Sequence, residues 1–214
     1  MLTTLALASV LVFTPIDGVL VCVDDAPRPV TDGYQAMYEA GVDYDAFLAA
    51  ANQRKELWHG NSDKAHGLDL SFVERAKAVG GSWHFLVVAI DSCSDSVSTV
   101  PYLAQLVSLV DGLDLRIVDP TAGQAVMEAH RTPDGRAATP TILLLDDSFE
   151  ARGCFIERPR SLADWMIEND GKIGRATLVA QKMEWYAENA GQETVEELVG
   201  ILEAAASGRT VCGR

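Results

Sequence analysis

An α/β fold is predicted by three features of the sequence. Phe85–Ile90 is a short, unbroken apolar run, which is typical of a strand that is buried on both faces. Polar residues follow this run, where a helix can begin, and a second strand is expected at Leu113–Val118. Further along, Thr139-Pro140 stands just before the apolar segment Ile142–Leu145. Strands that alternate with helical segments indicate a sheet covered by helices.

Residues 1–30 are interpreted as a leader and a linker. The run Leu5–Phe13 is apolar enough for the centre of an export signal, but no Lys or Arg precedes it. We favour an imperfect export signal over an extra strand or a misassigned start. An exported or periplasmic location is therefore favoured over a cytoplasmic one, and membrane contact is expected only if this segment is an uncleaved anchor.

A helical extension is expected over residues 31–81. Apolar residues at helical spacing predict helices at residues 34–40, 43–58 and 70–78. The second helix is expected to end at His59-Gly60-Asn61, because glycine readily adopts the left-handed conformation that closes a helix.

Residues 82–208 are assigned to the α/β domain and its C-terminal helices. Beyond the features named above, elements are expected at residues 96–110, 119–129, 150–156, 161–167, 174–189 and 194–206. Pro101 lies inside the first of these helices and is expected to kink it, because proline removes a backbone hydrogen bond. Residues 209–214 are expected to form a loose tail.

Cys93 is the main candidate for chemistry. It follows the first strand and precedes a helix, where unpaired backbone N–H groups and the helix dipole favour a thiolate. Ser96 is placed to donate a hydrogen bond to the sulfur, whereas the Asp95 carboxylate opposes a thiolate. Asp91, at the end of the strand, is expected to be solvated rather than to accept a proton.

The chain resembles thioredoxins in the order strand, Cys-x-x-Ser, helix, strand, helix, and then Thr-Pro before a hairpin. It is most similar to little-characterised bacterial members that have a helical extension and a Cys-x-Asp-Ser-like site, and the resemblance covers residues 43–204. The motifs that carry it are Cys93-Ser94-Asp95-Ser96, Thr99-Val100-Pro101-Tyr102-Leu103-Ala104, Arg152-Gly153, Arg158-Pro159 and Trp185-Tyr186-Ala187.

The resemblance implies a thioredoxin-like three-layer α/β/α sandwich with a central mixed sheet, an N-terminal helical extension and extra C-terminal helices. It also implies that Pro140 is in the cis form and faces Cys93. In that arrangement, the backbone of Thr139 and Pro140 holds an extended substrate peptide beside the sulfur.

The activity implied is thiol-disulfide exchange in cell redox homeostasis, without a cofactor. Cys93 forms mixed disulfides with protein or low-molecular-weight partners, because Ser96 replaces the resolving thiol. Val87 stands where thioredoxins have a buried acid, and Ser92 replaces their tryptophan, so efficient general disulfide reduction is not expected. The alternative is a redox-inactive module that binds peptides or proteins. An iron–sulfur carrier similar to glutaredoxins is less favoured, because no basic residue precedes Cys93.

The net charge and the spacing of the cysteines disfavour two further classes of function, nucleic-acid binding and metal binding. The net charge of −14, from 31 acidic and 17 basic residues, disfavours nucleic acid as a partner. The other cysteines are Cys22, Cys154 and Cys212; no Cys-x-x-Cys spacing or nearby histidine indicates a metal site. Cys154, on the hairpin strand that follows Pro140, is expected to be a small packed residue, with a resolving thiol for Cys93 as the alternative. Cys212 is expected to be a bystander, with pairing to Cys22 or to another molecule as the alternatives.

Overall fold

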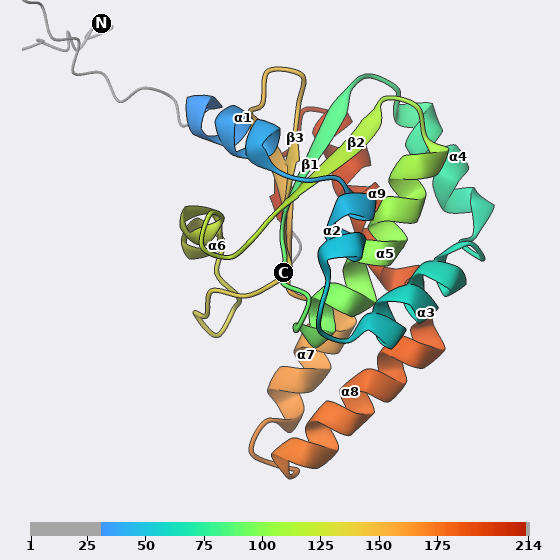
Figure 1. Ribbon diagram of the computed structural model, residues 1–214, viewed down its shortest axis with the longest axis vertical. Helices are drawn as coiled ribbons and strands as arrows, with labels where there is room; N and C mark the ends of the chain where they lie inside the picture. Colours follow the sequence, from blue (N-terminus) through green and yellow to red (C-terminus); the bar gives the residue numbers. More distant parts are fainter. Residues whose placement is uncertain (1–30, 213–214) are drawn as a thin grey trace, which may run out of the picture.

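A five-stranded mixed sheet lies at the centre of the computed structural model, which describes residues 31–212 (Figure 1). The strands are β1 (Trp83–Val88), β2 (Leu113–Val118), β3 (Thr141–Leu145), β4 (Ala151–Ile156) and β5 (Val211–Cys212), in the order β2-β1-β3-β4-β5. The β1/β2 and β4/β5 pairs are parallel, and β3 is antiparallel to both of its neighbours. The leader expected over residues 1–30 falls outside the described residues.

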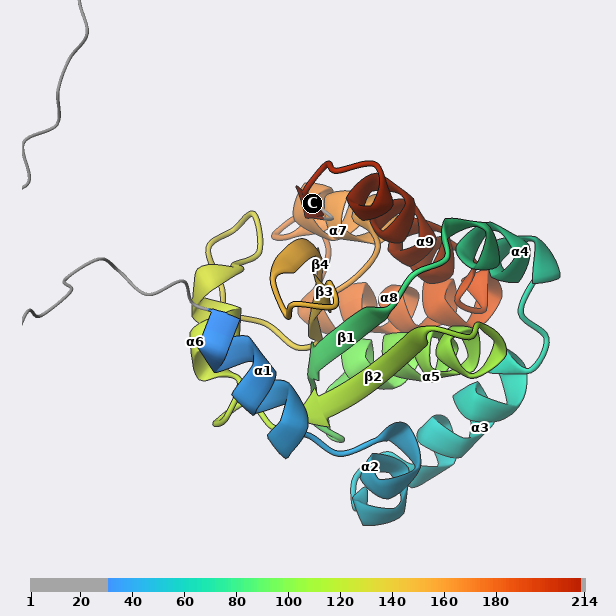
Figure 2. The ribbon, with the colours of Figure 1, turned by 90° about the horizontal axis from the view of Figure 1, so that it is seen from above.

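Helices cover both faces of this sheet. The helices are α1 (Thr31–Ala40), α2 (Tyr44–Ala50), α3 (Lys55–Ala65), α4 (Leu70–Val79), α5 (Ser94–Leu109), α6 (Gln124–Ala129), α7 (Arg160–Asn169), α8 (Arg175–Asn189) and α9 (Gln192–Ala206). Seen from above, α1 and α6 lie on one side of the sheet, and α4, α5 and α9 lie on the other (Figure 2). The predicted α/β sandwich with helical additions at both ends is confirmed. No helix among residues 31–212 is long and apolar enough to cross a membrane.

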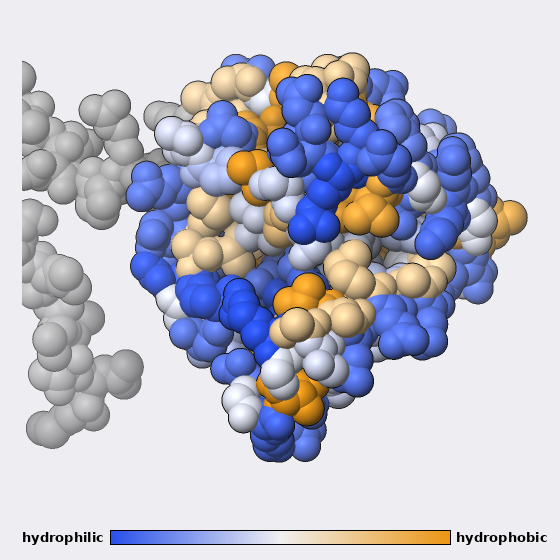
Figure 3. All heavy atoms as spheres, turned by 60° about the horizontal axis from the view of Figure 1, so that its bottom comes forward, coloured by the Kyte–Doolittle hydropathy of each residue, from blue (hydrophilic) through white to orange (hydrophobic). Residues whose placement is uncertain are grey.

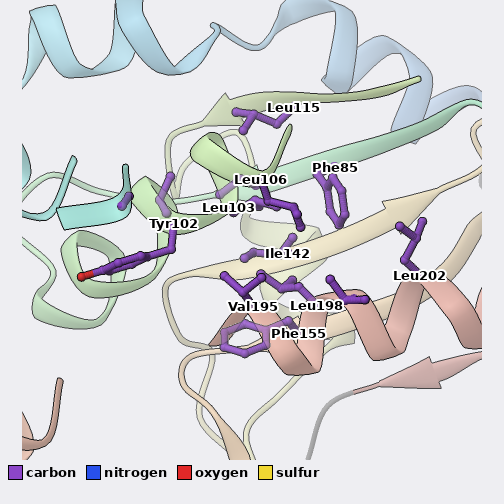
Figure 4. Close-up of a cluster of buried hydrophobic side chains, with 14 of the residues drawn as sticks. Phe85, Tyr102, Leu103, Leu106, Leu115, Ile142, Phe155, Val195, Leu198 and Leu202 are labelled. Carbon is purple, nitrogen blue, oxygen red and sulfur yellow. The ribbon is translucent and has the colours of Figure 1, made fainter. Parts of the chain in front are cut away.

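The two faces of the sheet bury separate apolar clusters, because side chains alternate along each strand. Phe85, Ile142 and Phe155 pack with residues of α5 and α9 in the larger cluster (Figure 4). Leu86 and Leu143, their neighbours along the strands, pack against α1 and α6 on the opposite face.

Pro101 lies within α5, and the helix continues unbroken from Ser94 to Leu109. Proline has no N–H to donate to the carbonyl group of Val97, four residues earlier. The side chain of Asn61, in α3, donates to that carbonyl oxygen at 2.8 Å instead. The extension therefore satisfies the backbone group that Pro101 leaves open.

The helix predicted over residues 43–58 is wrong in its boundaries. The chain forms α2 and α3 with a break between them, and Gly60 lies inside α3 rather than at the end of a helix. At the break, the Asp91 carboxylate accepts hydrogen bonds from the backbone N–H groups of Asn52 at 2.7 Å and Gln53 at 2.9 Å. Asp91 therefore anchors the extension to the end of β1, which corrects the expectation of a merely solvated acid.

The tail expected over residues 209–214 is also wrong where the structure describes it. Val211 and Cys212 form β5, and Cys212 makes a disulfide with Cys154 of β4. Cys154 is therefore not a free packed thiol, and Cys212 is not a bystander. Gly153 permits this arrangement, since a Cβ atom there would lie 2.4 Å from Ile201 of α9 and 2.8 Å from the carbonyl oxygen of Val211.

Candidate active site around Cys93

Cys93 is the N-cap residue of α5 and is partly exposed. Its sulfur accepts a hydrogen bond from the backbone N–H of Ser96 at 3.4 Å. The thiol donates to the carbonyl oxygen of Thr139 at 3.1 Å. The Thr139–Pro140 peptide bond is cis. The structure thus brings the cysteine at the end of β1 together with the turn that leads into β3.

The hydroxyl group of Ser96 does not take the role expected from the sequence. It is fully buried and has no hydrogen-bond partner among the described residues. The backbone of Ser96, rather than its side chain, contacts the sulfur of Cys93. Ser96 therefore contacts the Cys93 sulfur through its backbone and supplies no second sulfur beside it.

The Asp95 carboxylate is buried among donors from α8 and from the loop after β4. It accepts from Lys182 Nζ at 2.7 Å and from the hydroxyl of Tyr186 at 2.9 Å, and it pairs with Arg158 Nε at 3.2 Å. Two cations therefore lie against the Asp95 carboxylate, and one of them, Arg158, also pairs with Glu157. Burial, followed by the Asp95 charge, raises the pKa of Tyr186 well above its ordinary value, so the phenol remains a donor.

A series of ion pairs leads from Arg158 toward the surface. Arg158 pairs with Glu157, and Glu157 accepts from both terminal nitrogens of Arg136, at 3.2 and 3.1 Å. Arg136 in turn pairs with Asp134 at 2.6 Å. Acidic and basic groups thus alternate from the buried Asp95 to the surface.

A cavity of about 580 Å³ lies between the start of α5, the loop before β3, and the helices α7 and α8. Charged side chains from the Asp95 cluster share its lining with apolar groups of α7 and α8, including Met166 and Leu178. Figure 3, in which this end of the molecule comes forward, shows polar and apolar surface side by side. Ser94 lines the cavity, so the space begins one residue from Cys93.

Sequence reasoning did not assign a role to Lys182, Tyr186 or Arg158. Tyr186 and Arg158 were noted only as parts of motifs. Lys182 and Tyr186 are four residues apart, which places them on one face of a helix, but nothing in their spacing names Asp95 as their partner.

The family model described as Thioredoxin matches residues 41–174. The chain belongs to the thioredoxin family. The match to the family model ends before α8, so Lys182 and Tyr186 lie outside the matched residues. No curated protein matches the chain.

Two solved structures share the fold of this thioredoxin-family protein. A protein of unknown function, PA1234, from Pseudomonas aeruginosa is 20% identical with a TM-score of 0.63. The alignment covers 80% of this chain and 98% of that one. An HIV epitope-scaffold, 4E10, is also 20% identical, with a TM-score of 0.64 and the same two coverages. At this identity the likeness concerns the fold alone.

Proposed function

We propose that this thioredoxin-family protein carries out thiol-disulfide exchange through a single thiol, Cys93. The Cys93 thiolate attacks one sulfur of a substrate disulfide, a mixed disulfide forms, and the second substrate sulfur leaves as a thiolate that takes up a proton. A thiol from outside the protein then attacks the mixed disulfide, which releases Cys93 and forms a new disulfide with the substrate sulfur.

The observation that carries this proposal is the contact between the Cys93 sulfur and the Thr139 carbonyl group, 3.1 Å apart. An extended peptide that pairs with the backbone at Thr139 would bring its own sulfur beside Cys93. Exposure of Cys93 and its position at the start of α5 also support the proposal.

The positions of the other cysteines indicate where the thiol that resolves the mixed disulfide comes from. Within residues 31–212, Cys93 is the one cysteine outside a disulfide. Cys154 packs in the cluster on the α1/α6 face of the sheet, whereas α5, which Cys93 caps, packs on the other face. A resolving thiol from a partner molecule therefore fits the site better than one from β4.

The test is adduct formation with bis(2-hydroxyethyl) disulfide, followed by intact-mass measurement and peptide mapping. We expect one adduct on Cys93 that forms faster in the folded chain than in the same chain in urea, and that an added thiol removes. Cys93→Ser should abolish this adduct, while Cys22→Ser should leave it unchanged. A folded Cys93 that reacts no faster than the unfolded one would contradict the proposal.

A second candidate function is non-covalent binding of a peptide or protein in the cavity beside Asp95. It is favoured by one observation: Cys93 itself does not line that cavity. The binding module predicts that a ligand recovered with the folded chain is retained by Cys93→Ser, whereas thiol exchange predicts that it is lost.

A further inference from the structure

Three potential metal ligands meet at the edge of the sheet where β5 is added. They are Cys154 in β4, Cys212 in β5 and His130 at the C-terminal end of α6, and their ligand atoms all lie within 4.8 Å of one another. The two sulfurs are joined in the disulfide. Cys154 packs on the face of the sheet opposite to α5, which Cys93 caps, and the thiol exchange proposed above does not use this cluster.

The hydrogen bond that His130 makes leaves one ring nitrogen available to a metal. Its Nδ1 lies 2.9 Å from the carbonyl oxygen of Val126. A carbonyl oxygen can only accept, so Nδ1 carries the proton and Nε2 keeps the lone pair in the neutral ring. Histidine ligands commonly make this contact, because it fixes the tautomer and the direction of the ring.

The three candidate ligands differ in their exposure to solvent. Cys154 is 1% exposed and packs with Val126 and Leu143, whereas Cys212 and His130 are partly exposed. An ion or a reductant can therefore approach from the Cys212 side. Apolar walls of this kind limit the access of water to a bound ion.

Metal binding requires the two sulfurs to separate after reduction. Zinc–sulfur bonds of about 2.3 Å at a tetrahedral angle hold two thiolates about 3.8 Å apart. Cys212 can supply this movement, because β5 is two residues long and pairs only with Gly153 and Cys154 of β4.

We infer that Cys154, Cys212 and His130 bind Zn²⁺ when the disulfide is reduced. A dithiol reductant transfers two electrons and two protons to the disulfide and becomes a cyclic disulfide itself, which leaves two thiols on the protein. Zn²⁺ displaces both thiol protons and takes two sulfurs, the imidazole nitrogen and one water. A small-molecule disulfide such as oxidised glutathione can reverse the step by thiol-disulfide exchange. It takes up two electrons and two protons and leaves as two thiols, while Cys154 and Cys212 are joined again and Zn²⁺ is released, so disulfide and metal exclude each other.

The test uses the full chain with Co²⁺ and Zn²⁺ as probes. After reduction with a phosphine, Co²⁺ should give thiolate charge-transfer absorption, with about one ion bound per chain. Zn²⁺ should displace it and raise the melting temperature of the reduced protein. The oxidised chain should give neither effect.

Variants separate this site from the other cysteines. Cys154→Ser and Cys212→Ser should each abolish the cobalt absorption. His130→Gln, which can still form the disulfide, should weaken zinc binding at least tenfold, roughly as ligand-shell changes do. Cys93→Ser and Cys22→Ser should leave binding unchanged, so failure here is distinct from failure of thiol exchange at Cys93.

Three results would overturn the inference: cobalt absorption in the oxidised chain, zinc affinity unaltered by His130→Gln, or binding lost in Cys93→Ser. Circular dichroism of each reduced variant checks that it is folded. His130→Gln remains informative even if the cysteine variants unfold, since its disulfide can hold β5 in place until reduction.

Discussion

At the scale of single residues, Asp95 combines burial with a full set of partners. Its side chain is 7% exposed, and those of Lys182 and Arg158 are 6% and 7% exposed. Removing one member of such a cluster leaves an uncompensated buried charge, whereas replacing both members of a pair removes the charge and its desolvation together. The contribution of Asp95 is therefore best measured as a coupling with Lys182.

Asp95→Asn is expected to lower the free energy of unfolding by about 3–5 kcal/mol, because Lys182 loses its buried counterion. Asp95→Asn combined with Lys182→Met should cost less than the sum of the two single changes. Urea unfolding of the four proteins measures this coupling. As a control, Glu196→Gln, which breaks an exposed pair with Arg75, should cost less than about 1 kcal/mol.

Ser96→Cys is expected to add the missing resolving thiol. The Ser96 backbone nitrogen is already 3.4 Å from the Cys93 sulfur, so a sulfur at position 96 begins within one helical turn of its partner. The variant should form a disulfide between positions 93 and 96 and gain insulin-reducing activity, measured by the turbidity of the released insulin chains. Ser96→Ala is the matched control and should gain none. A variant that stays fully reduced under oxidising conditions would contradict the geometry described for the site.

At the scale of elements, the extension is tied to the α/β domain by specific polar contacts. Asp91 holds the break between α2 and α3, and Trp58 of α3 donates from its indole nitrogen to the Asp91 carbonyl oxygen at 3.0 Å. Burial raises the pKa of Asp91, but backbone hydrogen bonds outweigh burial and hold the pKa below its ordinary value of 3.8.

Asp91→Ala is expected to lower the free energy of unfolding by about 2 kcal/mol near neutral pH, because charged hydrogen bonds are lost. A carboxylate whose pKa is lower in the folded state stabilises above its unfolded pKa, and this stability disappears as the pH falls through the folded pKa. The difference between Asp91→Ala and the unaltered protein should therefore shrink below pH 3.8. Urea unfolding at a series of pH values gives this profile, and a difference that grows on acidification would contradict it.

The strands were predicted closely because their signal is local. Leu113–Val118 agrees with β2 at both ends, and the strand predicted at 85–90 overlaps β1, which begins two residues earlier at Trp83. Helix boundaries failed where distant residues decide them. The break before α3 depends on Asp91, which lies in another part of the chain. The helix predicted over 96–110 agrees with α5 to within two residues at each end, and Asn61 donates to the carbonyl group that Pro101 leaves open.

The candidate site, too, was predicted in part. Cys93 and the Thr139-Pro140 turn come together as the resemblance implied, because both lie at element ends that the fold brings together. The partners of Asp95 were missed because they lie more than 60 residues away, and spacing carries no information at that range. The Cys154–Cys212 bond, 58 residues apart in sequence, was missed for the same reason.

At the scale of the whole molecule, the disulfide closes a loop that contains α7, α8 and α9. Cys212→Ser is expected to lower the free energy of unfolding by about 4 kcal/mol in the chain-entropy account, given the separation of 58 residues. Thermal unfolding with a chelator present measures it. Under reducing conditions the variant and the unaltered protein should unfold alike, and a difference that survives reduction would assign the loss to packing instead.

Because Lys182 and Tyr186 come from α8, a shortened chain must include this helix to keep the partners of Asp95. A fragment cut at residue 174, where the family match stops, would keep Asp95 but lose its nearest cation and its phenol. In such a fragment, water would have to hydrate the Asp95 carboxylate, or the carboxylate would have to be protonated. We therefore expect a fragment that folds by itself to extend beyond the residues that the family model matches.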